Sequence, residues 1–141
     1  MKRIDVVYAL ITNEDNTQVL MVKNRESEAW TLPGGTVERL ETLEAAMIRE
    51  AKEETGYDIK VYGIIAVNEA KLKSSDEHAI FFTFRGEIDG GREGIYRPEE
   101  ITDVQWIELK QADELMPYYK EGISGLVEAN KEIIYYNEGD V

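Results

Sequence analysis

The chain has 141 residues, of which 43% are hydrophobic and 32% charged, and it carries a formal net charge of −13. This size and composition predict a single globular domain over residues 1–141, and the excess of acid excludes a protein that binds DNA or long RNA through Lys and Arg. There is no cysteine, no export signal and no apolar run near the ~20 residues that span a bilayer, so we expect a cytoplasmic protein without disulfides or membrane association.

Five runs rich in β-branched or aromatic residues, each bounded by turn formers, predict strands. They are residues 5–12, 18–23, 61–68, 79–87 and 101–108. The polar residues 13–16 between the first two runs predict a hairpin turn. Glycines and a proline in residues 90–98 predict a mobile loop before the last strand.

One helix is predicted in the middle of the chain and one near its end. The first spans residues 43–55, with Thr42 as the N-cap and Gly56 as the stop signal. The second spans residues 123–136, where apolar residues recur at helical spacing, and a further helical turn is expected around residues 111–115. Strands in sequence with these helices predict an α/β fold, a mixed sheet with helices on its faces.

The first predicted helix carries three carboxylates on one face. Glu50 lies three residues before Glu53 and four before Glu54, so the three side chains can converge on one site. Ala46 and Met47 on the first turns of that face turn it toward the protein interior. Acids on an inward face repel each other and lose hydration, so a proton, an arginine or a cation must offset their charge. Mg²⁺ suits such a site because it takes oxygen ligands and shares them with substrate phosphates.

The residues before this helix favour a functional interpretation of the acids. Residues 30–35 predict a strand end that runs into a Pro-Gly-Gly turn, where glycine lets the backbone approach a ligand closely. Glu41 and Arg49 can form an ion pair that fixes the turn against the helix. The alternative is that Glu53 and Glu54 only solvate a surface helix, which is the usual case for acidic helices taken alone.

The same region resembles the Nudix box, a spaced pattern of Gly, Glu, Arg-Glu, Glu-Glu and Gly. The matching residues are Gly35, Glu41, Arg49, Glu50, Glu53, Glu54 and Gly56, whereas Ala51 and Tyr57 occupy the two aliphatic positions of the pattern. The resemblance implies a Nudix-type α/β/α sandwich. It also implies a MutT-like, metal-dependent hydrolase that cleaves a diphosphate linkage in a nucleoside di- or triphosphate or a related nucleotide conjugate.

The resemblance further implies residue roles. Glu53 and Glu54 would be the main ligands of Mg²⁺, for which Mn²⁺ can substitute, and the Gly35 carbonyl a further ligand. Glu50 would be a ligand or the base that activates water, with Arg49 and Glu41 as an orienting pair. An additional metal ligand is expected in residues 98–101, where Glu100 is the first choice and Glu99 the alternative. An exposed acid pair without function is an equally good interpretation of these two residues.

Substrate contacts are predicted less sharply. Lys23, Arg25 and Arg85 are the cations that could hold phosphate, and nothing in their spacing selects one. Trp30 could stack on a base, although tryptophan more often packs in a core. His78, the only histidine, is expected at a strand edge rather than in catalysis. The implied partner is a small nucleotide-like molecule, and the sequence makes no prediction of an oligomeric state. A non-catalytic nucleotide-binding or regulatory module is the alternative, against which the complete set of box acids argues.

Overall fold

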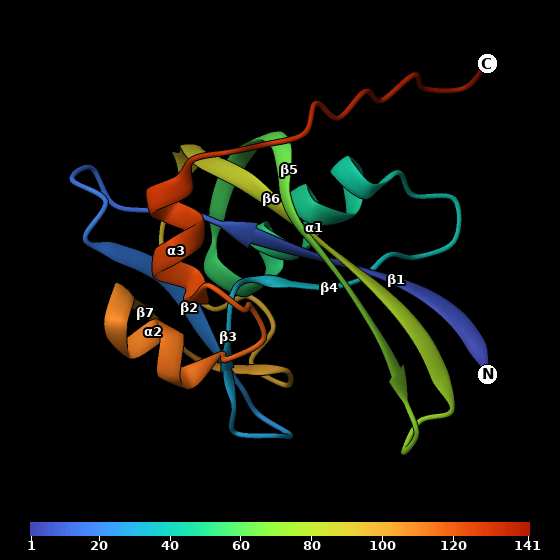
Figure 1. Cartoon of the computed structure of the whole chain (residues 1–141), viewed down its shortest axis with the longest axis horizontal. Coiled ribbons are helices and arrows are strands. Elements are labelled where there is room, and N and C mark those ends of the chain that lie inside the picture. The colour runs from blue at the N-terminus through green and yellow to red at the C-terminus, as the bar shows by residue number, and fades with distance from the viewer.

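The computed structural model describes residues 1–141 and contains seven strands and three helices (Figure 1). The strands are β1 (Lys2–Leu10), β2 (Gln18–Asn24), β3 (Trp30–Thr31), β4 (Gly34–Thr36), β5 (Tyr57–Leu72), β6 (Glu77–Gly91) and β7 (Ile101–Glu108). The helices are α1 (Leu43–Thr55), α2 (Leu109–Leu115) and α3 (Gly122–Ala129). None of the helices combines the length and the apolar character that crossing a membrane requires.

The strands form two sheets, one in the order β4-β1-β6-β5 and one in the order β3-β2-β7. β1 and β6 are parallel, whereas every other strand pair is antiparallel. α1 lies on one side of the sheets, and α2 and α3 lie on the other side (Figure 1). This arrangement confirms the predicted mixed sheet and the α/β/α sandwich.

Two cores hold the layers together. The first includes Val7 and Phe84 from the sheet, and Met47 and Ala51 from α1. The second includes Leu10 from the sheet with residues of α2, α3 and the segment between them. Because successive side chains of a strand point to opposite faces, β1 contributes Val7 to one core and Leu10 to the other. The apolar strand β1 therefore fixes both helical layers to the same sheet.

The elements around α1 follow the sequence prediction closely. The Thr42 hydroxyl accepts a hydrogen bond from the Ala45 N–H at 3.1 Å, and Gly56 ends the helix with a φ of +82°, in the left-handed region. All five predicted strands are present, although β5 and β6 extend well beyond residues 61–68 and 79–87. β3 is the strand end expected before the Pro-Gly-Gly turn, whereas β4 was not predicted, because three residues are too few to show a period.

The prediction of a helix over residues 123–136 is wrong at its C-terminal end. α3 stops at Ala129, and Asn130 follows with a φ of +47°. The chain then runs along the edge of β5, where Ile133 and Ile64 exchange backbone hydrogen bonds of 2.8 and 2.9 Å. Tyr135 packs edge-on against Phe84, with ring centroids 5.1 Å apart. Pairing with an unpartnered sheet edge and burying an aromatic ring therefore override the helical spacing of the apolar residues.

The mobile loop predicted at residues 90–98 also differs in the structure. β6 continues to Gly91, and the backbone that follows is attached to the end of α1. The N–H groups of Arg92, Gly94 and Tyr96 donate hydrogen bonds to the carbonyls of Gly56, Thr55 and Glu53 at 3.3, 2.9 and 3.2 Å. The last carbonyls of a helix lack partners within the helix, and this segment supplies them. The segment is thus held against the helix that carries the acids.

Candidate active site

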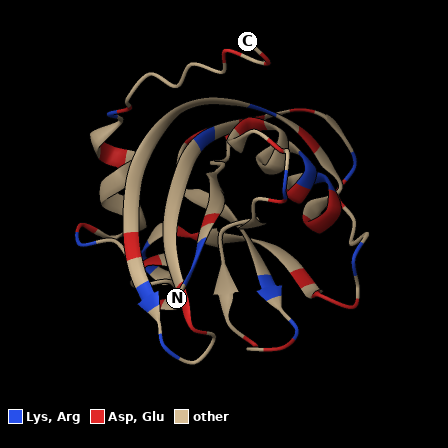
Figure 2. Cartoon of the chain, turned by 90° about the vertical axis from the view of Figure 1, so that its right-hand side faces the viewer, with Lys and Arg blue, Asp and Glu red and all other residues tan.

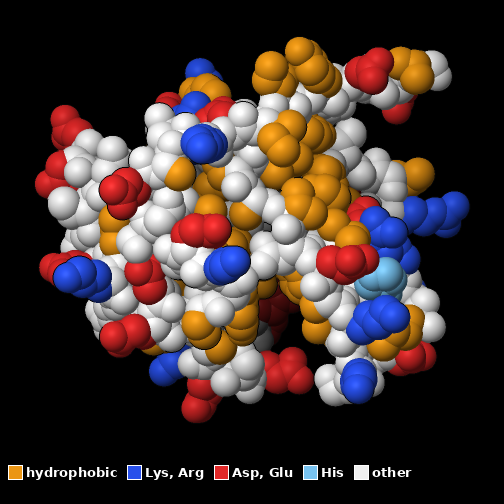
Figure 3. All heavy atoms as spheres, viewed as in Figure 1, with side chains coloured by type: hydrophobic (Ala, Val, Ile, Leu, Met, Phe, Trp, Pro, Cys, Tyr) orange, Lys and Arg blue, Asp and Glu red, His pale blue; other side chains and the backbone are white.

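The acidic face of α1 points into the protein, as predicted. Glu50 and Glu54 retain only 8% and 4% of their accessible surface, and they continue the buried face that Ala46 and Met47 begin. Both line a cavity of about 820 Å³, called here the carboxylate cavity. Its other walls include the turn at Gly34 and Gly35, the acids Glu99 and Glu100, and the tyrosines Tyr8 and Tyr118. Figure 3 shows the surface hollowed between the β5–β6 hairpin and the opposite half of the molecule, with acidic side chains deep inside.

Glu54 is a buried carboxylate without a cationic partner. Its Oε1 accepts a hydrogen bond from the Gly34 N–H at 2.9 Å, and it forms no ion pair. Burial raises the pKa of Glu54 well above its usual range, and the nearby Glu50 and Glu100 raise it further. An ionised carboxylate in this position is costly unless a positive charge joins it. The site is therefore suited to a cation.

Glu50 is placed between a guanidinium and the glycine turn. Arg49 Nη1 donates to Glu50 Oε1 at 2.9 Å, yet burial outweighs this contact and raises the Glu50 pKa to about 7. A Cβ atom added at Gly35 would lie 2.7 Å from the Glu50 carboxyl carbon. Glycine at position 35 thus lets the backbone approach this carboxylate, and a larger residue would displace the Glu50 side chain.

The predicted pair of Arg49 and Glu41 forms. Arg49 Nε donates to Glu41 Oε2 at 2.7 Å and Nη2 donates to Oε1 at 2.9 Å, a bidentate arrangement that holds the Glu41 pKa below its usual range. Figure 2 shows the alternation of acidic and basic residues along α1. The pair joins the segment before α1 to the second turn of the helix and fixes the direction of the Arg49 guanidinium toward Glu50 and Glu53.

Glu99 and Glu100 both line the cavity but differ in their surroundings. A backbone hydrogen bond and a 2.6 Å contact with Arg97 Nε hold the pKa of Glu99 below its usual range. The charge of Glu100 instead contributes to the raised pKa values of both Glu50 and Glu54. Glu100 therefore interacts electrostatically with the α1 acids, which favours it over Glu99 as the additional acid.

Arg97 belongs to the site but was not predicted. Its guanidinium contacts Glu53 at 3.1 Å, Glu99 at 2.6 Å and Glu100 at 3.2 Å. Sequence reasoning missed it because it lies 44 positions after Glu53 in a segment without periodicity, and only the folded chain brings the two together. The available signal was a basic residue two positions before the acid pair at positions 99 and 100.

The predicted substrate contacts are distributed differently. The Trp30 side chain packs against the second core, while its neighbours Ala29 and Thr31 line the carboxylate cavity. Arg25 Nε donates to the Pro98 carbonyl at 2.8 Å and its N–H to the Glu100 carbonyl at 2.8 Å, so Arg25 attaches the acid-bearing segment to the end of β2. Neither residue lines the cavity itself.

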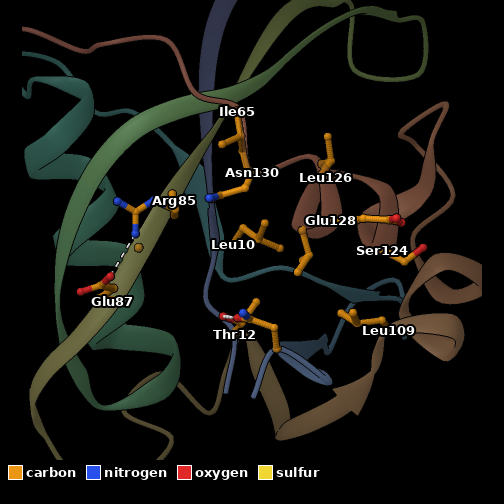
Figure 4. Close-up of a pocket in the computed structure, with 13 residues that line it drawn as sticks. Leu10, Thr12, Ile65, Arg85, Glu87, Leu109, Ser124, Leu126, Glu128 and Asn130 are labelled. Carbon is orange, nitrogen blue, oxygen red and sulfur yellow. Dashed lines mark hydrogen bonds and ion pairs between the residues drawn. The ribbon is translucent and has the colours of Figure 1, made fainter. Parts of the chain in front are cut away.

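Arg85, one of the candidate cations for holding phosphate, is not among the residues that line the carboxylate cavity. It lines a separate cavity of about 690 Å³ between the sheet and α3, called here the Arg85 cavity (Figure 4). Its guanidinium binds Glu132 at 2.5 Å and Glu87 at 2.9 Å, and it lies 4.2 Å from the centre of the Tyr62 ring. His78 pairs with Glu69 at 2.7 Å. It lies near the start of β6 and not on an edge strand, because its backbone position is paired with both β1 and β5.

The residues of the carboxylate cavity fit a divalent cation in their chemistry, although no three acids are grouped closely enough to hold one in the arrangement seen. Oxygen donors alone line the acidic wall, and hard cations prefer such donors. Glu53 is occupied by two guanidinium groups, from Arg49 at 3.3 Å and Arg97 at 3.1 Å. Glu54, which has no such partner, is the acid most in need of a positive charge.

The sequence was compared with family models and with known proteins. The family model described as the NUDIX domain matches residues 2–127. A Bacillus subtilis protein, named provisionally as an 8-oxo-dGTP diphosphatase, is 35% identical over 100 residues, which cover 71% of this chain and 63% of that protein. An ADP-ribose pyrophosphatase from Methanocaldococcus jannaschii is 35% identical over 81 residues, which cover 55% of this chain and 48% of the relative. The chain thus spans less than two thirds of the length of each of these relatives.

Solved structures show the same fold. A MutT protein from Methanosarcina mazei Go1 superposes with a TM-score of 0.75 at 26% identity, covering 93% of this chain and 97% of the other. A NUDIX hydrolase from Nitrosomonas europaea reaches a TM-score of 0.79 at 19% identity, covering 99% and 100% of the two chains. The first supports kinship, and the second supports the fold alone.

Proposed function

Because the chain belongs to the Nudix family, we propose that it is a hydrolase that cleaves the diphosphate linkage of a nucleoside di- or triphosphate or a related nucleotide conjugate. The observation that carries this proposal is the pair of buried acids, Glu50 and Glu54, on the wall of the carboxylate cavity. Desolvation of buried carboxylates destabilises a protein unless a positive charge joins them, and these acids therefore support a hydrolase that works with a cation.

Nudix hydrolases generally use divalent metal ions, and we infer that Mg²⁺ or Mn²⁺ serves this protein. Glu53 and Glu54 would be its main ligands, with Glu50, Glu100 and the Gly35 carbonyl as further oxygen donors. The buried carboxylate of Glu54, held by one backbone N–H alone, supports this assignment. When bound, such an ion neutralises charge on the diphosphate and lowers the pKa of water.

Glu50 is proposed as the base. In the metal-free protein burial raises the pKa of Glu50 to about 7, so this carboxylate accepts a proton more readily than an exposed glutamate, as general-base catalysis requires. Glu50 takes the proton of the attacking water as the water oxygen bonds to phosphorus, and the bond between that phosphorus and the bridging oxygen breaks. Arg49, fixed by Glu41, holds the Glu50 carboxylate in one orientation and stabilises its charged form. Arg49 and Glu41 are thus positioning residues in this proposal.

An adjoining cavity supports a nucleoside end for the substrate. It measures about 520 Å³ and shares Tyr8 and Tyr118 with the carboxylate cavity. Its walls are largely apolar and include Phe81, whose ring stacks with that of Tyr8 at 6.0 Å between centroids and 4° between planes. Aromatic walls favour a flat aromatic group such as a nucleobase. A nucleobase held here would direct its phosphates toward Glu50 and Glu54.

The experiment is a panel of nucleoside triphosphates, nucleoside diphosphates and nucleotide conjugates, assayed with Mg²⁺ or Mn²⁺ for released phosphate, pyrophosphate and nucleoside monophosphate. We expect turnover of at least one class, its loss in excess chelator and its recovery when the cation is restored. Activity that persists in excess chelator would contradict the metal assignment. Binding of nucleotides without turnover of any would favour the non-catalytic module.

A further inference from the structure

The guanidinium of Arg97 bridges two segments that carry acids. It contacts Glu53 of α1 at 3.1 Å, and it contacts Glu99 and Glu100 of the segment before β7 at 2.6 and 3.2 Å. One positive charge therefore lies within ion-pair distance of three negative charges and offsets the repulsion among them. The Glu53 carboxylate, predicted to hold the cation, is thereby engaged by an arginine.

The backbone around Arg97 is fixed on both sides. The Tyr96 N–H donates to the Glu53 carbonyl at 3.2 Å, and the Arg97 carbonyl accepts from the N–H groups of Glu100 and Ile101, both at 2.9 Å. On the other side Arg25 donates to the Pro98 and Glu100 carbonyls. The backbone that carries Arg97 is thus held at the junction of α1 and β7, which places its side chain within reach of Glu53.

We propose that Arg97 is a built-in counterion of the carboxylate cavity, which holds Glu53 and Glu100 together without a cation and competes with a divalent cation for them. Arg97 is a positioning residue in this assignment, because it acts through the acids it holds. The inference rests on the proposed metal site, and it adds a residue outside α1 that sets the affinity of this site for the cation. The same contacts explain why the three acids of α1 are not gathered around one point: Glu53 faces guanidinium groups instead.

If Arg97 competes with the cation, a variant without the Arg97 charge should bind the cation more tightly, whereas a variant with a damaged site should bind it more weakly. Removing a positive charge beside the acids strengthens their attraction for a cation, whereas loosening the site would weaken cation binding. Arg97 is partly exposed to solvent, which screens its charge. We therefore expect Arg97→Gln to bind Mn²⁺ about three- to tenfold more tightly than the wild type.

The test measures Mn²⁺ affinity by electron paramagnetic resonance on the whole chain without substrate, so that no turnover is involved. Arg97→Lys keeps the charge and should stay close to wild type. Arg92→Gln removes a charge from the same segment without removing an ion pair to the acids, and it should have a smaller effect than Arg97→Gln. Hydrogen exchange of residues 92–100 in the metal-free protein should accelerate in Arg97→Gln and slow again when Mn²⁺ is added.

Two results would overturn the assignment. If the wild type binds Mn²⁺ and Arg97→Gln binds it equally or more weakly, Arg97 does not compete, and the proposed metal site stands without it. If the wild type does not bind Mn²⁺ at all, both the metal site and the counterion fail. An Arg92→Gln effect as large as that of Arg97→Gln would assign the gain to net charge alone and would also exclude the specific counterion.

Discussion

The carboxylate cavity and the Arg85 cavity are of similar size, about 820 and 690 Å³. They differ in whether their charged residues have partners of opposite charge. In the Arg85 cavity the arginine is matched by Glu132 and Glu87, and Asp113 nearby is bonded to Ser124. In the carboxylate cavity Glu54 is buried without a counter-charge, and Glu50 keeps a raised pKa beside its arginine. A cavity with satisfied charges is compatible with structure alone, whereas uncompensated buried acids indicate a ligand that brings positive charge.

Replacing Glu50 tests the comparison most severely. Glu50→Gln keeps the size and the contact with Arg49 but removes the proton acceptor, so we expect turnover at saturating substrate to fall by about 10²-fold or more. Steady-state kinetics with circular dichroism as a check of folding would measure this. A rate within a few-fold of wild type would mean that another acid is the base.

The stability of the metal-free protein should also depend on the Glu50 pKa. This pKa rises from a usual 4.5 to about 7 on folding, so the folded state binds the proton more tightly. The resulting stabilisation is fully present below the unfolded pKa and is lost as the pH rises through about 7, and we expect a loss of about 1–3 kcal/mol. Urea unfolding in chelator between about pH 5 and 8 measures it.

Two features make this pH test specific. Glu41, whose pKa is lowered, contributes stability that is lost only as the pH falls through its folded pKa, outside the same window. Glu50→Gln should flatten part of the pH dependence, because it removes the titrating group. Stability that rises steadily from acid through neutral pH in the wild type would contradict the raised pKa.

The acid pair before β7 provides an internal control. Glu100→Gln should reduce turnover by about tenfold if Glu100 helps to hold the cation. Glu99→Gln should stay close to wild type, because the charge of Glu100, and not that of Glu99, acts on Glu50 and Glu54. Parallel measurements of kcat and of Mn²⁺ affinity separate the two variants. The reverse ranking would transfer the role to Glu99, and equal small effects would remove this segment from the site.

The smallest effect is expected in the Arg85 cavity. Arg85→Gln breaks partly exposed ion pairs with Glu132 and Glu87, so the free energy of unfolding should fall by about 0.5–1 kcal/mol while turnover changes less than about twofold. Denaturant unfolding and the hydrolysis assay are the two measurements. A large loss of turnover with unchanged stability would restore Arg85 as a substrate contact and erase the difference between the two cavities.

The sequence by itself determined the elements whose signals are local. The α1 helix appears at its predicted bounds because its cap, its stop signal and its apolar spacing lie within a few residues of one another. The same closeness explains why Glu50 and Glu54 could be placed on one inward face, and why Glu41 and Arg49 could be paired from their positions alone.

Only the tertiary structure decided features that join distant parts of the chain. Arg97 reaches Glu53, Arg85 turns away from the acids, and Ile133 leaves a helical pattern to pair with β5. In each case a partner distant in sequence stabilises the residue more than its local surroundings would. The partner is an opposite charge for Arg97, a matched ion pair for Arg85 and an open sheet edge for Ile133. Such partners have no fixed spacing in sequence, because their positions depend on how the strands are ordered in the sheets.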